Sequence, residues 1–274
     1  MRRTQACVLS LVAGSAFLLP GCVGSWQQAK FQRDIETVFR LPAGDGIHVR
    51  TRNGAVELTE VVRDDVLVRA SVRATTQERA DAVRVVGVSA DGALQISAVW
   101  PDARKGSEGV SFVIEAPGGR PVDIGTGNGR VTIAGFAGGV KADSSNGQID
   151  ISGHDGPLDL RTSNGKIIVT DATGAVDAET SNGSVTVRLT DGASGPVDID
   201  TSNGSIGVIV GPGFAGTVHT DTSNGSIRVH NEAGAGQVEM VQDAKTEKVV
   251  RVRGGETEST LDTSNGSVDV TVRG

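Results

Sequence analysis

The sequence predicts an all-β protein, a right-handed parallel β-helix or β-solenoid preceded by an irregular, partly antiparallel β region. Two observations predict this fold. A short motif, Thr-Ser-Asn-Gly followed by Ser or Lys, recurs along the chain with small variations. Aliphatic residues alternate with polar ones on both sides of each copy. Alternation with a period of two is typical of half-buried strands, and a repeat at nearly constant spacing is typical of stacked coils.

The first segment predicts export rather than structure. Residues 1–21 combine two arginines with an apolar run, as in a secretory signal peptide. The ending Leu-Pro-Gly-Cys resembles a bacterial lipobox, so we expect Cys22 to become the first mature residue and to carry lipid. The alternative is ordinary signal cleavage beside an incidental cysteine. Residues 22–40 are then expected to form a lipidated N-terminus and tether, sorted to the outer membrane if the host is Gram-negative.

Residues 41–118 predict an irregular N-terminal β region. About three strands are expected from Ile47 onward, and a helical turn capped by Thr75 or Thr76 follows them. Two alternating runs around Asp91-Gly92 predict a β-hairpin, because this dipeptide favours tight turns.

Residues 119–274 predict the solenoid. From Asn128, successive Asn-Gly pairs are separated by 18, 18, 18, 21, 21 and 41 residues. In a typical copy, residues 197–201 read Val-Asp-Ile-Asp-Thr, which places the aliphatic residues and Thr on the inner face and the aspartates outside. The long last interval predicts a protruding hairpin or one irregular coil at residues 232–256.

Each copy has two strands joined by Asn-Gly, which by itself would also suggest a hairpin. So short a hairpin buries little, and the same inward columns recur in every copy. Parallel stacking of successive copies lets each coil hydrogen-bond to its neighbours, and parallel crossovers are almost always right-handed.

The repeated corner is expected to be structural. Asn and Gly tolerate left-handed backbone conformations, so the pair can turn the chain sharply between two faces. Stacked Asn side chains can hydrogen-bond to their copies at the strand repeat of roughly 4.8 Å. The expected ladder consists of Asn128, Asn146, Asn164, Asn182, Asn203, Asn224 and Asn265. Asn53-Gly54 is an outlying copy of the same corner.

The outward positions carry carboxylates in columns, which indicates either a solubilising face or an acidic strip that binds Ca²⁺ through hard oxygen ligands. The calcium-binding nonapeptide pattern does not occur in the sequence, so no cofactor is predicted, and calcium stays open as an alternative. Three residues are candidates for a transition-metal site without a visible fourth ligand: Asp177, Asp198 and His219.

Charge and composition restrict the function. The formal net charge is −7, which argues against a nucleic-acid partner because phosphates require basic surfaces. Aromatic residues make up only 3% of the chain, whereas sugar-binding clefts favour aromatic platforms. No carboxylate pair stands apart from the repeat, so a polysaccharide-active enzyme on a β-helix is kept only as an alternative.

Three stretches of sequence resemble a known group. The stretches TRNGAVELTE, VSFVIEAP and the serial TSNGSI or TSNGSV copies are similar to the bacterial "putative adhesin" family of β-strand-repeat envelope proteins. This is a domain family of unknown function related to the head domains of autotransporter adhesins, and the resemblance covers residues 47–274. It implies a β-helical fold at a cell surface and supplies no catalytic residue.

The sequence therefore predicts a non-catalytic, lipid-anchored protein of the cell envelope whose solenoid is an adhesin-like interaction or scaffold module. Its expected partners are the membrane, through the lipid, and an unidentified surface, glycan or protein. A calcium-binding or envelope-stress-associated surface protein is the remaining alternative.

Overall fold

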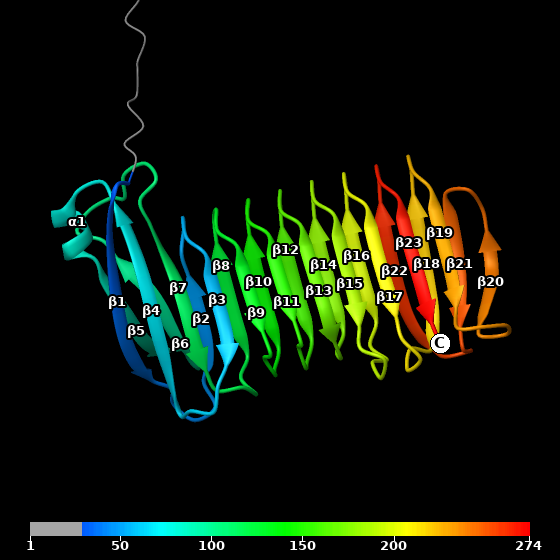
Figure 1. Cartoon of the computed structure of the whole chain (residues 1–274), viewed down its shortest axis with the longest axis horizontal. Helices are drawn as coiled ribbons and strands as arrows, with labels where there is room; N and C mark the ends of the chain where they lie inside the picture. The colour runs from blue at the N-terminus through cyan, green and yellow to red at the C-terminus, as the bar shows by residue number, and fades with distance from the viewer. Residues whose placement is uncertain (1–28) are drawn as a thin grey trace, which may run out of the picture.

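The computed structural model describes residues 29–274, which form twenty-three strands and one short helix. The predicted signal peptide and Cys22 lie outside the described residues. Two sheets, here named sheet A and sheet B, face each other along an elongated molecule (Figure 1). In spatial order, sheet A contains β1 (Phe31–Arg40), β4 (Asp65–Ala74), β7 (Gly109–Ala116), β3 (Val56–Glu60), β9 (Val131–Ala134), β11 (Ile149–Ser152), β13 (Ile167–Ala172), β15 (Val185–Leu189), β17 (Ile206–Val210), β23 (Val268–Arg273) and β19 (Ile227–Glu232).

Sheet B has twelve strands. In spatial order it contains β20 (Val238–Asp243), β21 (Glu247–Val252), β18 (Gly216–Thr222), β22 (Thr257–Thr263), β16 (Val197–Thr201), β14 (Val176–Thr180), β12 (Leu158–Thr162), β10 (Val140–Ser144), β8 (Val122–Thr126), β2 (Gly46–Arg50), β6 (Ala93–Val99) and β5 (Arg84–Ala90). No helix of the described chain is long and apolar enough to span a membrane.

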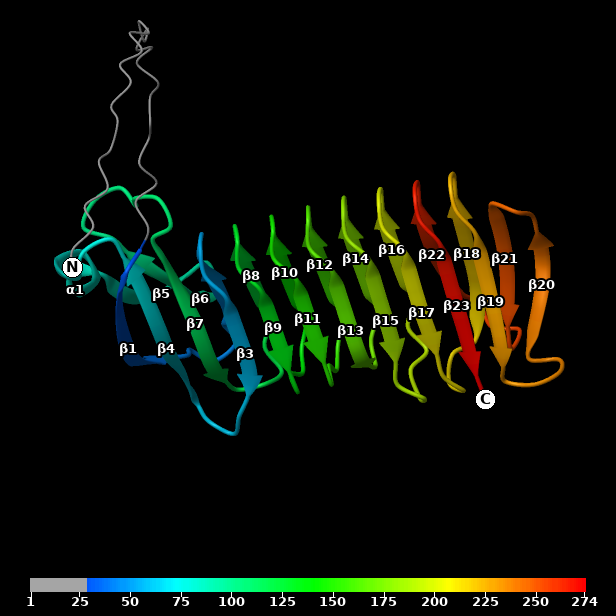
Figure 2. The same cartoon turned by 45° about the horizontal axis from the view of Figure 1, so that its top comes forward.

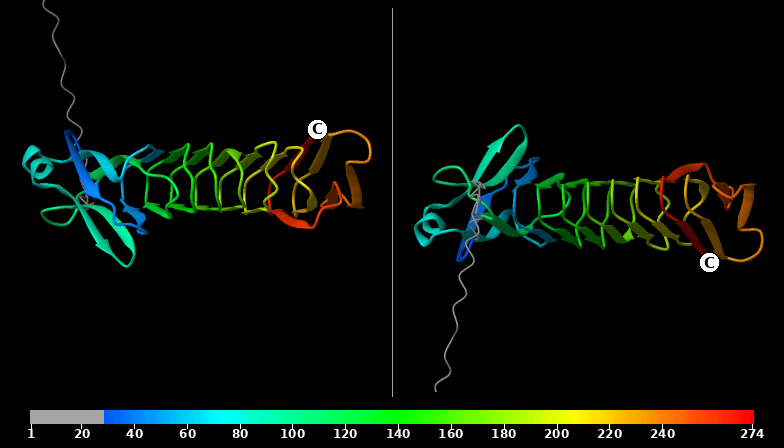
Figure 3. Two further views of the ribbon diagram at one scale, coloured as in Figure 1. Left: turned by 90° about the horizontal axis from the view of Figure 1, so that it is seen from below. Right: turned by 90° about the horizontal axis from the view of Figure 1, so that it is seen from above.

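The predicted solenoid is confirmed between β8 and β17. Each coil contributes one strand to sheet B and the next strand to sheet A, and the strands pair in parallel with their neighbours in the adjacent coils. The coils wind in the right-handed sense, and the two sheets lie close together along the whole repeat (Figures 1 and 3). This geometry follows from the period-two pattern, because one face of every strand has to be buried against the opposite sheet.

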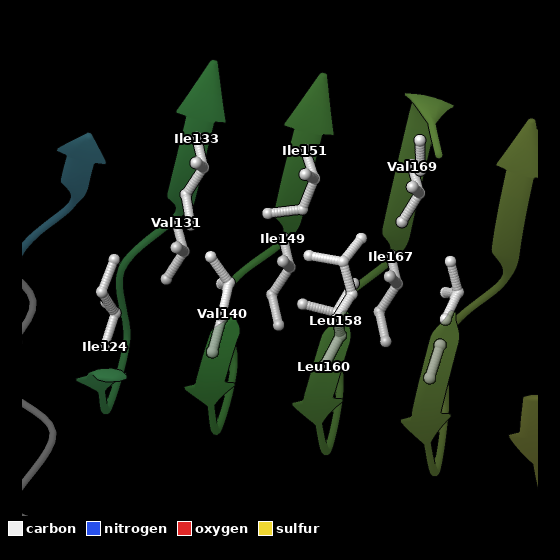
Figure 4. Packing of buried hydrophobic residues seen from close by; sticks show 14 of the residues in the cluster. Ile124, Val131, Ile133, Val140, Ile149, Ile151, Leu158, Leu160, Ile167 and Val169 are labelled. Carbon is white, nitrogen blue, oxygen red and sulfur yellow. The ribbon is translucent and has the colours of Figure 1, made fainter. Parts of the chain in front are cut away.

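The core is a stack of aliphatic side chains in register. Val131, Ile149 and Ile167 occupy equivalent positions on adjacent strands of sheet A and are fully buried. Figure 4 shows them facing Val140 and Leu158 of sheet B. Residues of the same shape therefore contact their own copies along the axis, which keeps the coil spacing uniform.

Asparagine side chains form a continuous hydrogen-bonded ladder at the corners. The Asn Nδ2 group of each coil donates to Asn Oδ1 of the neighbouring coil, over donor–acceptor distances of 2.6 to 3.0 Å. Asn53 is the first member and accepts from Asn128. A buried threonine, or Ser144 at the Asn146 corner, supports the corners of the regular coils: Thr162 Oγ1 accepts from Gly165 N and donates to Gly147 O. The corner side chains thus satisfy backbone groups that the turn leaves unpaired.

The reason predicted for the corner glycines is wrong. Neither these glycines nor the asparagines before them have a positive φ. Glycine is required because adjacent corners lie in backbone contact: a Cβ placed on Gly165 would lie 1.9 Å from Gly147 O. The constraint is the close approach of neighbouring coils rather than a left-handed torsion.

The N-terminal region contains the antiparallel pairs expected there. β1 and β7 both pair antiparallel with β4, and β5 and β6 form the predicted hairpin around Asp91-Gly92. Helix α1 (Gln77–Ala82) is capped by Thr76, whose side chain accepts from Arg79 N. The predicted tether is wrong in its second half, because residues 31–40 form β1 at the edge of sheet A. Alternate side chains of β1 are half-buried against the core. Most residues of this segment are polar, so its sequence did not indicate a strand.

The last coil in sequence is not the last coil in space. Residues 257–273, here called the C-terminal coil, form β22 and β23. β22 lies between β16 and β18, and β23 lies between β17 and β19 (Figure 2). The expectation that consecutive segments stack consecutively is therefore wrong at this end. The excursion expected at residues 232–256 is the antiparallel hairpin of β20 and β21, which pairs with the other side of β18.

Candidate functional site

The outward side chains of sheet B form two rows along the solenoid, here named the charged face. In spatial order the first row is His48, Asp123, Lys141, Asp159, Asp177, Asp198, Thr260 and His219. The second row is Arg50, Gly125, Asp143, Arg161, Glu179, Asp200, Asp262, Asp221 and Glu247. Register pairing fixes these rows, because equivalent residues of parallel strands lie side by side.

The part of the charged face nearer the N-terminus alternates in charge. Arg50 Nη2 lies 2.5 Å from Asp123 Oδ2, and Lys141 Nζ lies 3.5 Å from Asp159 Oδ2. Arg161 contacts three carboxylates, those of Asp159, Asp177 and Glu179, at 3.1, 3.8 and 3.3 Å. These carboxylates, Asp159 foremost, raise the pKa of Arg161. Cations and anions thus alternate along this part of the face.

A polar groove of about 490 Å³ runs beside these ion pairs. It is lined by Arg50, Arg161, Asp143 and Glu179, and by the serines that precede the corner asparagines, Ser145, Ser163 and Ser181. Gly125 leaves room for the Arg50 side chain, because a Cβ there would lie 2.9 Å from Arg50 Cδ. The groove therefore offers guanidinium, carboxylate and hydroxyl groups at intervals of one coil, an arrangement suited to an extended polar ligand.

The far part of the charged face is acidic. Asp200, Asp262, Asp221 and Glu247 follow one another on four adjacent strands, and in the described chain no Lys or Arg forms an ion pair with them. Burial, together with Asp221 and Asp200, raises the pKa of Asp262. Burial and the neighbouring Asp159 also raise the pKa of Asp177. Calcium binding by these carboxylates stays the open alternative to a solubilising face.

The predicted metal trio is not assembled. Asp177 and Asp198 are neighbours, but β22 separates Asp198 from His219 by two strand spacings, about 9.6 Å. Asp198 Oδ1 instead accepts from Thr260 N at 3.0 Å, and His219 Nε2 lies 2.8 Å from Glu258 Oε2. Residues 29–274 contain no group of three or more His, Cys, Asp or Glu side chains placed to hold a metal ion.

Family comparison identifies the architecture. A family model described as Toastrack DUF4097 matches residues 18–273, nearly the whole chain. The chain belongs to this family. The matched residues include both the solenoid and the N-terminal β region. The resemblance predicted from the sequence, to an adhesin-like family of unknown function, is confirmed.

Comparison with solved structures gives matches at low identity, two of which are described here. A "putative adhesin" from Bacteroides fragilis is 13% identical, with a TM-score of 0.40, over 88% of this chain and 97% of that chain. A "putative cell adhesion protein" from Clostridium sporogenes is 10% identical, with a TM-score of 0.38, over 89% of this chain and 100% of that chain. A search of curated proteins found no match.

The position of the C-terminal coil between two earlier coils of this Toastrack protein was not predicted from the sequence. It brings Asp262 between Asp200 and Asp221, although sequence order had placed Asp221 next to Asp200. It also removes His219 from the aspartates. No signal in the repeat itself distinguishes the two stacking orders, because every copy carries the same corner.

Proposed function

We propose that this Toastrack protein is a non-catalytic, lipid-anchored component of the cell envelope that uses the charged face as an adhesin-like binding surface. The observation that carries the proposal is the charged face itself, a double row of mostly charged side chains on a stiff parallel sheet. A surface of this kind recognises an extended polymer or another surface through many spaced polar contacts rather than through one enclosed pocket.

The distribution of charge supports an orientation on the membrane. Residues 29–135 contain fourteen Lys and Arg and fourteen Asp and Glu, so they are neutral overall. Residues 136–274 contain ten Lys and Arg and nineteen Asp and Glu, so they carry a net charge of −9. Anionic lipid headgroups repel acidic surfaces. Lipid on Cys22 would hold the neutral end at the membrane, and repulsion would direct the acidic end away from it.

The groove supports binding at the mixed-charge part of the face. Arg50 and Arg161 each reach carboxylates of the sheet, and their side chains are half-exposed at 52% and 42%. Guanidinium groups that are fixed but accessible can exchange these contacts for the carboxylates or hydroxyls of a ligand. The proposed ligand is therefore an extended polar polymer of the envelope, such as an acidic glycan or a protein segment.

The test compares two matched double variants on labelled protein that starts at residue 22 and carries Cys22→Ser. We expect saturable binding to isolated envelopes of the producing cells, weakened about tenfold by Arg50→Ala with Arg161→Ala, as for the loss of charge-assisted contacts. The control, Arg130→Ala with Arg188→Ala, removes one arginine that directly precedes β9 of sheet A and one in β15, both of which also form surface ion pairs. Equal affinity of the two double variants, or binding that does not saturate, would contradict the proposal.

A further inference from the structure

The C-terminal coil occupies an insertion site between two coils that match each other without it. Asp200 pairs with Asp262, which pairs with Asp221, and Ile206 pairs with Val268, which pairs with Ile227. Removing the coil would leave Asp200 opposite Asp221 and Ile206 opposite Ile227 in the regular register. The two flanking coils could then pair directly, so an empty insertion site need not leave unpaired strands.

At the loops that lead from sheet A back to sheet B, the flanking coils already contact each other without the C-terminal coil. The loop at residues 211–213 stacks directly on the loop at residues 190–192, and Gly213 N donates to Asp191 O at 2.7 Å. β22 and β23 thus separate the flanking coils at the strands but not at these loops. The coil is an addition to a structure that is otherwise continuous.

β22 pairs with β16 over fewer residues than the strands of regular coils pair with each other. Three residue pairs join β16 to β22, against five between β14 and β16. Side chains replace the missing backbone contacts: Ser259 Oγ accepts from Val197 N, and Asp198 Oδ1 accepts from Thr260 N, both at 3.0 Å. The like charges of Asp200, Asp262 and Asp221 oppose the insertion further.

Arg253 forms hydrogen bonds that hold the C-terminal coil against the preceding loop. Its guanidinium donates to Gly211 O and Phe214 O at 3.1 and 3.0 Å, and to Arg273 O at 2.6 Å. One side chain therefore links the loop around residues 211–214 to β23. Arg253 itself has a left-handed backbone, with φ of 50°, in the linker that crosses β18.

The last thirty-six residues of the solenoid, 238–273, wrap around β18. β21 pairs with one side of β18 and β22 with the other. A glycine-rich hinge at residues 233–237 joins this segment to β19. Gly234 and Gly236 have φ of 97° and 78°, and a Cβ on either would meet no atom within 4 Å. β19 and β20 are the terminal strands of the two sheets, so the hinge lies at the end of the solenoid (Figure 1).

We propose that residues 238–273 exchange between two copies of this chain, so that the C-terminal coil of each copy fills the insertion site of the other. A five-residue hinge spans up to roughly 17 Å, enough to cross between two solenoids that meet end to end. All contacts of the exchanged segment are recovered in the partner, so only the hinge conformation and the association entropy change. The product is a two-fold symmetric rod with the N-terminal regions at opposite ends. The exchange does not depend on the proposed binding function.

Disulfide trapping between two singly substituted chains tests the exchange. Ile209 of β17 and Thr271 of β23 are outward neighbours in adjacent parallel strands, a spacing that a disulfide spans. One chain carries Ile209→Cys and the other Thr271→Cys, both with Cys22→Ser. After incubation as a mixture and mild oxidation, we expect a heterodimer in at least about tenfold excess over a control mixture that uses Thr132→Cys of β9 in place of Ile209→Cys.

Two further chains keep the result interpretable. A single chain with both Ile209→Cys and Thr271→Cys should form an internal disulfide and stay monomeric, because the bond fixes the coil in its own insertion site. Arg253→Ala should accelerate heterodimer formation about tenfold, as expected for loss of charge-assisted hydrogen bonds. If the Ile209→Cys and Thr271→Cys mixture yields no more heterodimer than the control, while the doubly substituted chain still closes its internal disulfide, the exchange is refuted.

Discussion

At the corner of each coil, one glycine decides how closely two coils can approach. Gly165 lies against Gly147, which lies against Gly129, so that corner backbones contact one another directly. The asparagine before each glycine adds a side-chain hydrogen bond to its copy, and the threonine hydroxyl serves two coils at once. These three residues set the coil spacing together, which explains why they recur as a unit.

The substitution Gly165→Ala is predicted to destabilise the protein by at least about 2 kcal/mol, because the new methyl group would overlap Gly147 O. Gly192→Ala is the matched control, since a Cβ there meets nothing within 4 Å, and its effect should stay within about 0.5 kcal/mol. Urea unfolding followed by circular dichroism measures both changes. Equal stability of the two variants would show that corner contact is not what requires glycine.

Among the elements, α1 and the loop before β7 depend on one buried ion pair. Arg79 Nε and Nη2 both lie 2.7 Å from the carboxylate of Glu108, which is fully buried, and Arg79 also bonds Asp102. Thr75 and the backbone amide of Lys105 donate to the same carboxylate. Burial alone would raise the pKa of Glu108, but these hydrogen bonds outweigh it and lower the pKa to about 2.

The substitution Glu108→Gln is predicted to cost about 3 kcal/mol at pH 7, because it leaves the Arg79 charge buried without its partner. The pKa of Glu108 lies below its ordinary value of 4.5. The contribution of the Glu108 carboxylate to the free energy of unfolding is therefore complete above about pH 4.5 and is lost as the pH falls toward 2. Trp100 lies 5.9 Å from the Arg79 guanidinium, so its fluorescence should report the change during urea unfolding.

Glu36→Gln is the control for this element, since Glu36 pairs with Arg69 on the surface and is 63% exposed. We expect it to change stability by less than about 0.5 kcal/mol. If Glu108→Gln were as mild as this control, or if it left the loss between pH 4.5 and 2 unchanged, the buried pair would not be what holds α1 to the loop.

Over the whole molecule, the insertion of the C-terminal coil concentrates carboxylates at one end. Asp262 stands between Asp200 and Asp221, and the neighbouring side of β18 adds Glu247. Burial, together with the charges of Asp221 and Asp200, raises the pKa of Asp262 above its ordinary value of 3.8. A carboxyl group with a raised pKa destabilises the folded state at neutral pH, and the penalty disappears as the pH falls and the group is protonated.

The substitution Asp262→Asn is therefore predicted to raise stability at pH 7 by about 0.5 kcal/mol, because it removes like-charge repulsion across adjacent strands. The advantage over wild type should shrink as the pH falls from 7 toward 4, as thermal unfolding at each pH will measure. Asp269→Asn is the control: it removes the partner of Arg228, 3.2 Å away, and should give no gain. A lower melting temperature for Asp262→Asn at pH 7 would contradict this account of the acidic end.

Much of the fold could be predicted because burial acts locally on each strand. Residues 197–201 and their copies alternate so regularly that strand limits, inward columns and corners follow from the sequence. β1 could not be predicted in this way, because Arg33 and Thr37 share its inner face with Ile35 and Phe39. Val38 lies on the outer face, so no clean alternation marks the strand, and only pairing with β4 places Ile35 and Phe39 against the core. The rows of the charged face were likewise predictable within the regular coils, but not where the C-terminal coil divides them.

The sequence by itself determined that the chain stacks as a β-solenoid, since alternation and a repeated corner leave each coil only its copies as partners. Only the tertiary structure decided the order of those partners at the far end. The corners present the same asparagine and glycine, preceded by threonine or serine, so every stacking order satisfies the local rules equally well. Contacts between segments far apart in sequence, such as those of Arg253 with Gly211 and Arg273, then select one order.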